Sequence, residues 1–600
     1  MPDARGEQAE TVDDLRAGRG EVWEHDPGPP RNRRWARLFA DVPDHRGLGR
    51  ALSNSGAEAG ERFRWQFGPV FYRGRLGDDQ VRVLVVGQDA GSDEALAHRS
   101  FVGESGSRVQ NLLDQVGIAR SYLFLNTFVY SITGQFGGRL EDLALDPGSP
   151  LARHRNDLFD YAAARNDLRL VVAVGRAARE AVLAWNRSRG GTGDAAGGRL
   201  HELDASALGP HVRLVDVVHP GAGAQGSAAA VKASFSAAAE RVIGWADQDP
   251  DWLPVDPGGT RVTASGFTFG RTPVPLRDLP FGTPWRLGSG GTGTTRRDDG
   301  RSIEIEPGVR QTGEPVYPAE PAGGGRDGYD DDIGDLPWEP PRAAIEFDRG
   351  PTAARARLLV GAGGGPAWPD FAALGVPGAA TYGGGALYRG RFTGVRLLVL
   401  ADQSGHDDLV WGRALVGEAG QRLQGLLAAL GVTRSYLILR TLPVDTAGLS
   451  TGKVWALADR PDVVAHHRAV VGRVLDDNAV AAVVAVGPHA ERIAGRLDLD
   501  GQPVVVLPPW SSSGARAAWT AAYERLRSLG IALDQPPVGT PWDGDRAQIP
   551  RADLPFGFPR WQGSSGDRVV RSKRPAGADP PPEPAYKVWA PRWVDALDPP

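Results

Sequence analysis

The chain has 600 residues, which is more than one hydrophobic core usually organises, so two or more domains are expected. Its formal net charge of -5 excludes a chain that holds nucleic acid through a general excess of positive charge; such a site would need a local patch of Arg and Lys. Cysteine is absent, which excludes disulfides, thiolate nucleophiles, cysteine-ligated zinc and iron–sulfur clusters.

Targeting and membrane segments are not expected. Residues 1–20 have no apolar core and do not form a secretory signal. No apolar run approaches the roughly 20 residues that a membrane-spanning helix requires. We therefore expect a cytoplasmic protein with no membrane partner.

Short apolar runs alternate with helical patterns along the first half of the chain. Runs with the β-branched composition of buried parallel strands span residues 81–86, 122–125, 169–174 and 212–218. Between the first two of them, Gly117 ends a helical apolar stripe formed by Val109, Leu112, Leu113 and Val116. This alternation predicts a three-layer α/β/α domain with a central, mostly parallel sheet.

The second half of the chain repeats the first at an offset of 314 residues. The segment VLVVGQDAG at 83–91 returns as LLVLADQSG at 397–405. RSFVGESG at 99–106 returns as RALVGEAG from 413, and RSYLFLN at 120–126 returns as RSYLILR from 434. Shorter echoes are VVAVG, which ends at Gly175 and Gly487, and DLPFG, which begins at Asp278 and Asp553. The sequence therefore predicts two tandem copies of one α/β domain.

These patterns divide the chain into five segments. We predict an N-terminal tail at 1–30, a first domain at 31–287, a Gly- and Pro-rich acidic linker at 288–345, a second domain at 346–535 and a Pro-rich C-terminal extension at 536–600. The linker and the extension have the composition of solvated tethers.

Candidate functional residues follow the strands of the first domain. Ligands of parallel α/β sheets bind beyond the carboxyl ends of the strands. The segments 87–91, 126–130 and 219–226 each begin at such an end, so we expect them to meet at one site.

The motifs GQDAG, RSFVGESG, LFLNT and VVHPG, in this order over about residues 72–241, resemble those of the uracil-DNA glycosylase superfamily. The resemblance implies a DNA glycosylase that flips a base out of DNA and needs no cofactor and no metal. No lysine accompanies the motifs, which disfavours a Schiff-base lyase step and indicates a monofunctional enzyme.

The resemblance assigns a role to each motif residue. Asp89 is the water-activating carboxylate, which also stabilises positive charge on the sugar. His219 donates a hydrogen bond to O2 of the departing pyrimidine. Asn126 reads the edge of the flipped base, Phe101 stacks on it, and Gln88 adds a backbone or amide contact.

Two departures from the family pattern bear on the substrate. The uracil-specific branch has Pro-Tyr after its Gln-Asp, and that tyrosine crowds C5 of the pyrimidine, whereas Ala90 and Gly91 stand here. The loop 221–226 also lacks the bulky apolar wedge that usually fills the hole left by the flipped base, so Gln225 is the candidate plug.

The second domain has lost the site residues. Across the repeat, Asp89 becomes Gln403, Phe101 becomes Leu415, Asn126 becomes Arg440, and His219 aligns with Pro508. One interpretation is a structural partner that packs on the first domain. The other is a DNA-holding module in which Arg440 supplies positive charge and Trp510 stacks on a base.

Three functions remain open. The first is a glycosylase for a C5-modified cytosine, such as the hydroxymethylated or glucosylated bases of bacteriophage DNA, which would make the protein a defence enzyme. The second is housekeeping removal of uracil from DNA. The third is a non-catalytic DNA-binding protein that keeps a glycosylase fold, which the intact Asp89, Asn126 and His219 argue against.

Overall fold

A computed structural model gives the structure of the protein. The described residues are 23–30, 34–45, 47–48, 62–63, 69–133, 136–192, 200–221, 228–283, 303–306, 316–317, 347–361, 387–402, 408, 411–442, 450–537, 541–558, 569–572 and 586–589.

The first domain is built on a five-stranded sheet of order β2-β4-β3-β6-β7. Its strands are β2 (Arg73–Gly74), β3 (Val83–Gly87), β4 (Tyr122–Asn126), β6 (Leu170–Val174) and β7 (Arg213–Val217). All neighbours pair in parallel except β2, which is antiparallel to β4. Strands β1 (Arg62–Phe63) and β5 (Ile132–Thr133) form a separate, short antiparallel sheet.

Helices cover both faces of this sheet because its strands are apolar on both sides. Alternate strand residues such as Leu84 and Val86 pack with α2, α7 and α8, while Val83 and Val85 pack with α5 and α9. The helices are α2 (Arg34–Ala40), α4 (Ser92–Ala97), α5 (Glu104–Gln115), α6 (Gly138–Leu145), α7 (Pro150–Ala164), α8 (Arg176–Ser188) and α9 (Ala228–Gln248), with 3-10 turns η2 (Leu200–Glu202), η4 (Ala264–Gly266) and η5 (Leu276–Asp278). The predicted α/β class is confirmed.

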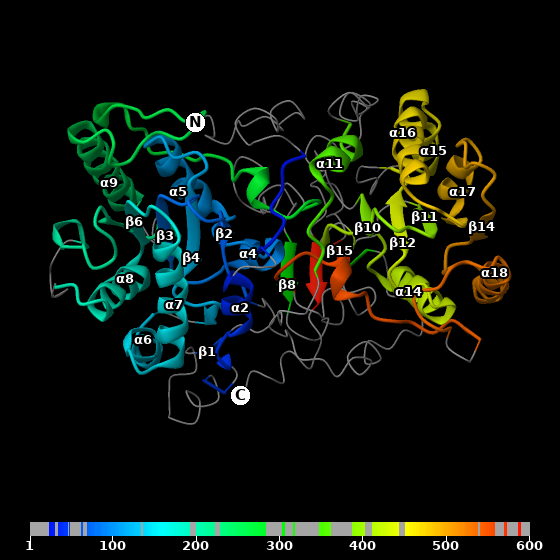
Figure 1. The fold of residues 1–600 in the computed structure, drawn as a ribbon, viewed down its shortest axis with the longest axis horizontal. Coiled ribbons are helices and arrows are strands. Elements are labelled where there is room, and N and C mark those ends of the chain that lie inside the picture. The colour runs from blue at the N-terminus through cyan, green and yellow to red at the C-terminus, as the bar shows by residue number, and fades with distance from the viewer. Residues whose placement is uncertain are drawn as a thin grey trace.

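The second domain has a sheet of the same design, with order β10-β12-β11-β13-β14 and only β10 antiparallel. Its strands are β10 (Tyr388–Gly390), β11 (Leu397–Ala401), β12 (Tyr436–Arg440), β13 (Ala482–Val486) and β14 (Val504–Leu507). Its helices are α11 (Ala353–Leu359), α14 (Glu418–Leu430), α15 (Thr451–Ala458), α16 (Pro461–Asp477), α17 (Pro488–Ala494) and α18 (Ala515–Ser528), with the 3-10 turn η7 (Arg551–Asp553). The two sheets lie at opposite ends of the molecule (Figure 1).

The segments expected to be tethers are partly structured. Strands β8 (Ile303–Glu306) and β9 (Val316–Tyr317) come from the linker, and β15 (Val569–Ser572) and β16 (Tyr586–Trp589) from the C-terminal extension. Together they form a four-stranded sheet of order β8-β16-β15-β9. Composition did not predict this sheet because its strands are short and separated by Gly- and Pro-rich sequence.

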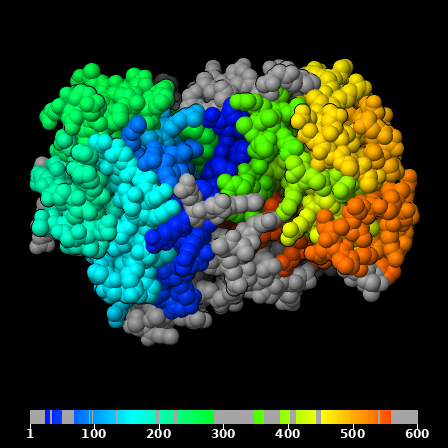
Figure 2. Space-filling view, in the orientation of Figure 1, coloured from blue at the N-terminus to red at the C-terminus, as the bar shows by residue number. Residues whose placement is uncertain are grey.

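Residues outside the predicted domain bounds also join the core. Asp26, in the predicted tail, is buried. Ile549, Leu554, Phe556 and Phe558, in the predicted extension, belong to the same apolar cluster as Trp35 and Phe39 of the first domain. The segments around residues 23–30 and 347–361 lie side by side between the two lobes (Figure 2), where His25 bonds the Arg349 carbonyl oxygen at 3.1 Å.

Candidate active site

Phe101 and Asn126 meet at the carboxyl end of β3, the strand that Asp89 follows by two residues. A Cβ atom on Gly87 would lie 2.4 Å from two ring carbons of Phe101 and 2.5 Å from Oδ1 of Asn126. Only glycine therefore fits at residue 87, and the aromatic ring and the carboxamide lie next to each other over this strand end. The expected meeting of the segments that follow β3 and β4 is present.

Asp89 is half-buried and held by two hydrogen bonds. Its Oδ1 accepts from Nε2 of Gln88 at 3.0 Å, and its Oδ2 accepts from the backbone N–H of Ile132 at 2.9 Å. Two donors on one carboxyl group fix its direction. The side chain of Gln88 therefore helps to hold the carboxylate of Asp89 in place.

Phe101 occupies a strained turn. Its φ is +56°, a conformation that bulky residues seldom adopt, and its ring packs on Phe124 at a centroid distance of 5.2 Å. Gly106, in the first turn of α5, makes room for this turn, since a Cβ there would lie 1.8 Å from the Phe101 carbonyl oxygen. Phe101 is buried, and its ring lies against Gly87 at the end of β3.

Asn126 ends β4 and is buried. One end of its carboxamide, Nδ2, lies 3.5 Å from Oγ of Ser100. The other end, Oδ1, has no hydrogen-bond partner among the described residues. A buried polar atom without a partner is costly, and a polar ligand edge at this point would satisfy it.

His219 follows β7, and the residue reaches the surface of the domain. Its Nδ1 accepts a hydrogen bond from the Gly221 N–H at 3.1 Å. In the neutral ring this places the proton on Nε2, which is then a donor. Partial burial of the ring lowers the pKa of His219, and the negative charge of Glu94 opposes this shift only in part.

Glu94, in α4, is a site residue that the sequence analysis missed. Its Oε1 accepts from the N–H groups of Val102 and Gly103 at 2.9 and 3.0 Å, and its Oε2 accepts from Gly91 N–H at 2.9 Å. It therefore ties the loop of Asp89 to the turn of Phe101. The repeat carried a signal for it, because an acidic residue, Asp408, stands at the same position of the second domain.

Two predicted substrate contacts differ in how far they can be placed. Gly91 is exposed and caps α4, and a Cβ there would meet only Oε2 of Glu94, at 2.8 Å. A larger side chain at residue 91 therefore requires the Glu94 carboxylate to move. Gln225 lies outside the described residues, so its expected role as the plug stays a prediction.

In the second domain, Arg440 occupies the position of Asn126. It is 5% exposed, forms an ion pair with Asp408 and donates to the Asp402 carbonyl oxygen at 2.8 Å. Burial lowers the pKa of Arg440 to about 9. A guanidinium in this place is not presented to DNA, and it stands at the strand end that corresponds to Asn126 of the first domain. This burial disfavours the DNA contact predicted for Arg440.

Three further positions of the second domain were singled out from the sequence, namely Leu415, Gln403 and Trp510. Leu415 repeats the left-handed turn of Phe101, with φ of +52°. Gln403 lies outside the described residues. Trp510 is half-buried among Trp519, Trp542 and Arg422, whose guanidinium lies 4.1 Å from its ring centroid. Stacking of Trp510 on DNA stays a prediction.

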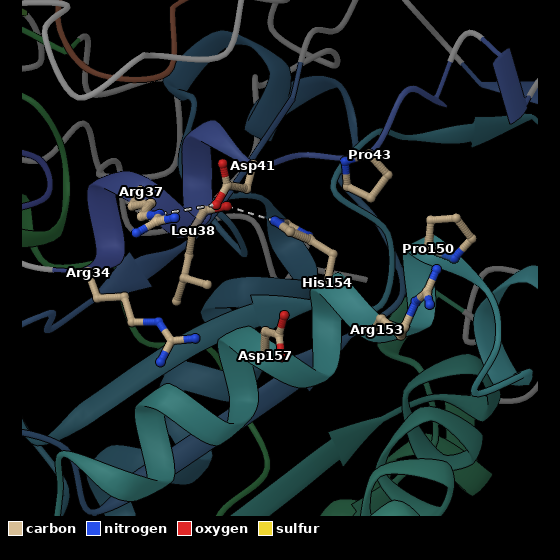
Figure 3. Close-up of a pocket in the computed structure, with 9 residues that line it drawn as sticks. All are labelled: Arg34, Arg37, Leu38, Asp41, Pro43, Pro150, Arg153, His154 and Asp157. Atoms are coloured by element: carbon tan, nitrogen blue, oxygen red, sulfur yellow. Dashed lines mark hydrogen bonds and ion pairs between the residues drawn. The ribbon is translucent and has the colours of Figure 1, made fainter.

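A cavity of about 570 Å³ lies between α2 and α7 of the first domain (Figure 3). It is lined by Arg34, Arg37, Leu38, Asp41, Pro43, Pro150, Arg153, His154 and Asp157. His45, two residues beyond Pro43, contacts the ring of Tyr130 at 4.8 Å, and Ile132 in turn bonds Asp89.

Groups of three or more side chains suited to a metal ion are absent from the described part of the chain. None of the described helices is long and apolar enough to cross a membrane.

Comparison with known proteins supports the motif assignment. Residues 75–240 match the family model of the uracil DNA glycosylase superfamily, and this range contains Asp89, Phe101, Asn126 and His219. A search of curated proteins finds no match. Residues 75–240 therefore form a domain of the uracil DNA glycosylase superfamily, which supports a DNA glycosylase-like function.

Proposed function

We propose that the first domain hydrolyses the N-glycosidic bond of a pyrimidine flipped out of DNA and leaves an abasic site. The observation that carries this proposal is the meeting of an oriented carboxylate, an aromatic ring and an unsatisfied carboxamide at one strand end. Phe101 stacks on the base, and Asn126 pairs its free amide end with the base edge. The carboxylate and the histidine then act on the bond.

Breaking the bond builds positive charge on the sugar and negative charge on the base. Asp89 stabilises the first and orients the attacking water, since its two hydrogen bonds hold the carboxylate in one direction. The Nε2–H of His219 stabilises the second through a hydrogen bond to O2 of the base. Both charges are thus met by groups that are already oriented.

The rate of excision is expected to stay constant as the pH falls through 6.5. The pKa of His219 is lowered below 6.5, so the ring stays neutral until the pH is lower still. Protonation would put a second donor on Nδ1, opposite the Gly221 N–H, and would break the turn that holds the ring. Single-turnover rates between pH 8 and pH 5.5 test this, and a half-maximal rate at or above pH 6.5 would contradict it.

The absence of a side chain at Gly91 supports one substrate class. Gly91 presents no ring where uracil specialists place tyrosine, so a pyrimidine with a C5 substituent is not excluded there. We propose that the enzyme excises 5-modified cytosines, such as phage hydroxymethylated or glucosylated bases, in antiviral defence. Removal of uracil is the second candidate, which family membership favours.

Gly91→Tyr is expected to separate these substrates. The new ring would occupy the C5 side, so excision of a bulky 5-modified base should fall by about 100-fold, whereas excision of uracil should be spared. The backbone at residue 91 has φ of -96°, which tyrosine adopts, and the new Cβ displaces Oε2 of Glu94, so the spared excision of uracil also shows that the site keeps its geometry. The assay is release of abasic sites from a panel of DNAs bearing uracil, thymine mismatches or 5-modified cytosines. An unmodified enzyme that excises uracil and ignores every 5-modified base would refute the defence role.

The DNA backbone is proposed to lie along the cavity between α2 and α7. Arg34, Arg37 and Arg153 are exposed there, and Arg153 makes no ion pair within the described residues. Arg31 and Arg33 precede them in the sequence, which makes this segment a local basic patch in a chain of net negative charge.

Arg153→Ala is expected to weaken binding to DNA of any sequence and to reduce the slope of log affinity against log salt by about 1. Arg525→Ala, at an exposed position of α18, is the matched control and should leave both quantities unchanged. Equal effects of the two variants in a fluorescence-anisotropy titration would remove this cavity from the proposed interface.

The second domain is proposed to support the first rather than to catalyse. Arg440 fills its pocket, and neither Leu415 nor Pro508 replaces the chemistry of Phe101 and His219. The buried contacts between residues of the two halves support this role.

A further inference from the structure

We propose that the second domain positions the base-stacking residue of the first. Residues Phe556, Gly557 and Phe558, named here the clamp, hold the turn that contains His98, Arg99 and Phe101. The inference rests on the proposed function in that Phe101 is taken as the stacking platform. Phe556 lies 457 residues beyond Arg99, in the predicted C-terminal extension, where Asp553 attaches the chain to Arg389 and Tyr436 of the second domain. The contact therefore joins a segment held by the second domain to the site of the first.

The first component is a backbone hydrogen bond to a buried arginine. Nη1 of Arg99 donates to the Phe556 carbonyl oxygen at 3.0 Å and to the His98 carbonyl oxygen at 2.7 Å. Nε of Arg99 donates to Oδ2 of Asp26 at 2.5 Å, and the side chain is 1% exposed. A buried guanidinium is costly unless its donors are satisfied, so loss of the Phe556 carbonyl would leave Arg99 seeking another position.

The second component is packing against His98. The ring of Phe558 lies 4.3 Å from that of His98, and a Cβ on Gly557 would lie 3.3 Å from the His98 Cβ. His98 and Phe101 both have positive φ, at +51° and +56°. Strained backbone of this kind persists only where the surroundings hold it, and here the clamp supplies part of those surroundings.

The clamp is anchored in its own domain. Asp553, three residues before Phe556, is buried against Arg389 and accepts from the hydroxyl of Tyr436, both in the second domain. The ring of Phe556 inserts among Phe39, Phe71 and Phe347 at centroid distances of 5.6, 5.4 and 5.2 Å. One short segment therefore contacts both domains.

The same arrangement occurs in the opposite direction, which supplies a built-in control. Arg413 donates to the carbonyl oxygen of Phe281, which belongs to the first domain, and to Oδ2 of Asp348 at 2.7 Å. Asp278, three residues before Phe281, is anchored in the first domain by Arg73 and Tyr122. This reverse clamp holds the turn of Leu415, where the proposed function has no stacking residue. The two domains thus exchange equivalent segments.

Matched glycine variants test the inference in the full chain. Gly557 and Gly282 have φ of +94° and +85°, so alanine strains both segments similarly. Gly557→Ala should lower the single-turnover excision rate by about tenfold, because a small displacement of a positioned group has a large effect on rate. Gly282→Ala should cause a similar loss of thermal stability and change the excision rate by less than about twofold. Phe556→Leu, which keeps an apolar side chain, should give an intermediate rate.

A second readout does not depend on activity. With 4-fluorophenylalanine incorporated in place of Phe101, the fluorine resonance should shift in Gly557→Ala and stay unchanged in Gly282→Ala. An unmodified enzyme that excises no base would end the proposed function while leaving this readout intact. A fluorine resonance that is unmoved by Gly557→Ala, or moved equally by both variants, would overturn the positioning role of the clamp.

Discussion

Replacing Asp89 by Asn is expected to lower the single-turnover rate of base excision by about 10³-fold, within the range typical of a lost acid–base group. Asparagine can still accept from the Ile132 N–H, so the loop should keep its shape. What disappears is the negative charge that stabilises the sugar and activates the water. DNA affinity and the unfolding temperature should stay close to those of the unmodified chain.

The control lies at the equivalent position of the second domain. Gln403→Ala should leave excision unchanged, because no chemistry is assigned to that domain. The two variants are compared on the same modified-base DNA, with abasic sites counted after a single turnover. If Gln403→Ala abolished excision and Asp89→Asn did not, catalysis would belong to the second domain and the assignment would be reversed.

The sequence predicted the parallel sheet and the strand ends that functional residues follow, because both depend on short-range patterns. The run from Val83 to Val86 is apolar at every position, as a strand covered on both faces must be, and Asp89 follows it directly. When a functional residue lies one or two positions after a strand, the position of the strand determines where that residue lies in the fold. Asn126, which ends β4, was placed by the same logic, whereas Phe101 was assigned only through the family resemblance of the RSFVGESG motif.

Contacts of long sequence separation were not predictable in this way. Asp26 was assigned to a tail, yet it bonds Tyr72 and Arg99. The signal was present in the repeat, since EHDPG at 24–28 returns as EFDRG at 346–350, and Asp348 bonds Tyr388 and Arg413 in the same manner. A repeated short motif outside the apolar strands therefore carries as much structural information as those within them.

Arg440 illustrates a different limit. A lone Arg at a former site position indicates positive charge, and sequence cannot tell whether that charge reaches the surface. The partner that decides the matter, Asp408, lies 32 residues earlier and on a different element. Arg440 is buried and paired with Asp408, so it is an internal residue rather than the expected DNA contact. Only the three-dimensional structure distinguishes these two roles.

The buried Arg440 leads to a second prediction, whose expected loss of excision is similar to that of Asp89→Asn. Asn126→Arg should copy the second domain's arrangement into the first and reduce excision by at least about 10³-fold, because the guanidinium would fill the space meant for the base. Glu94 stands where Asp408 stands in the second domain and would pair with the new Arg. The fold should survive, since the second domain holds an arginine at this point of an equivalent sheet. Loss of excision should therefore come with intact circular dichroism and intact binding to undamaged DNA.

The converse change separates a blocked pocket from a missing reaction. Arg440→Asn alone would leave Asp408 buried without its cation, which costs about 3–5 kcal/mol, so Asp408→Asn is combined with it. This double variant opens the second pocket but restores neither a carboxylate at Gln403 nor a histidine at Pro508. Excision should remain at the level of the unmodified chain and should still depend entirely on Asp89.

Full excision by Asn126→Arg would show that the base does not enter beside Asn126, and the pocket assigned to the first domain would then be wrong.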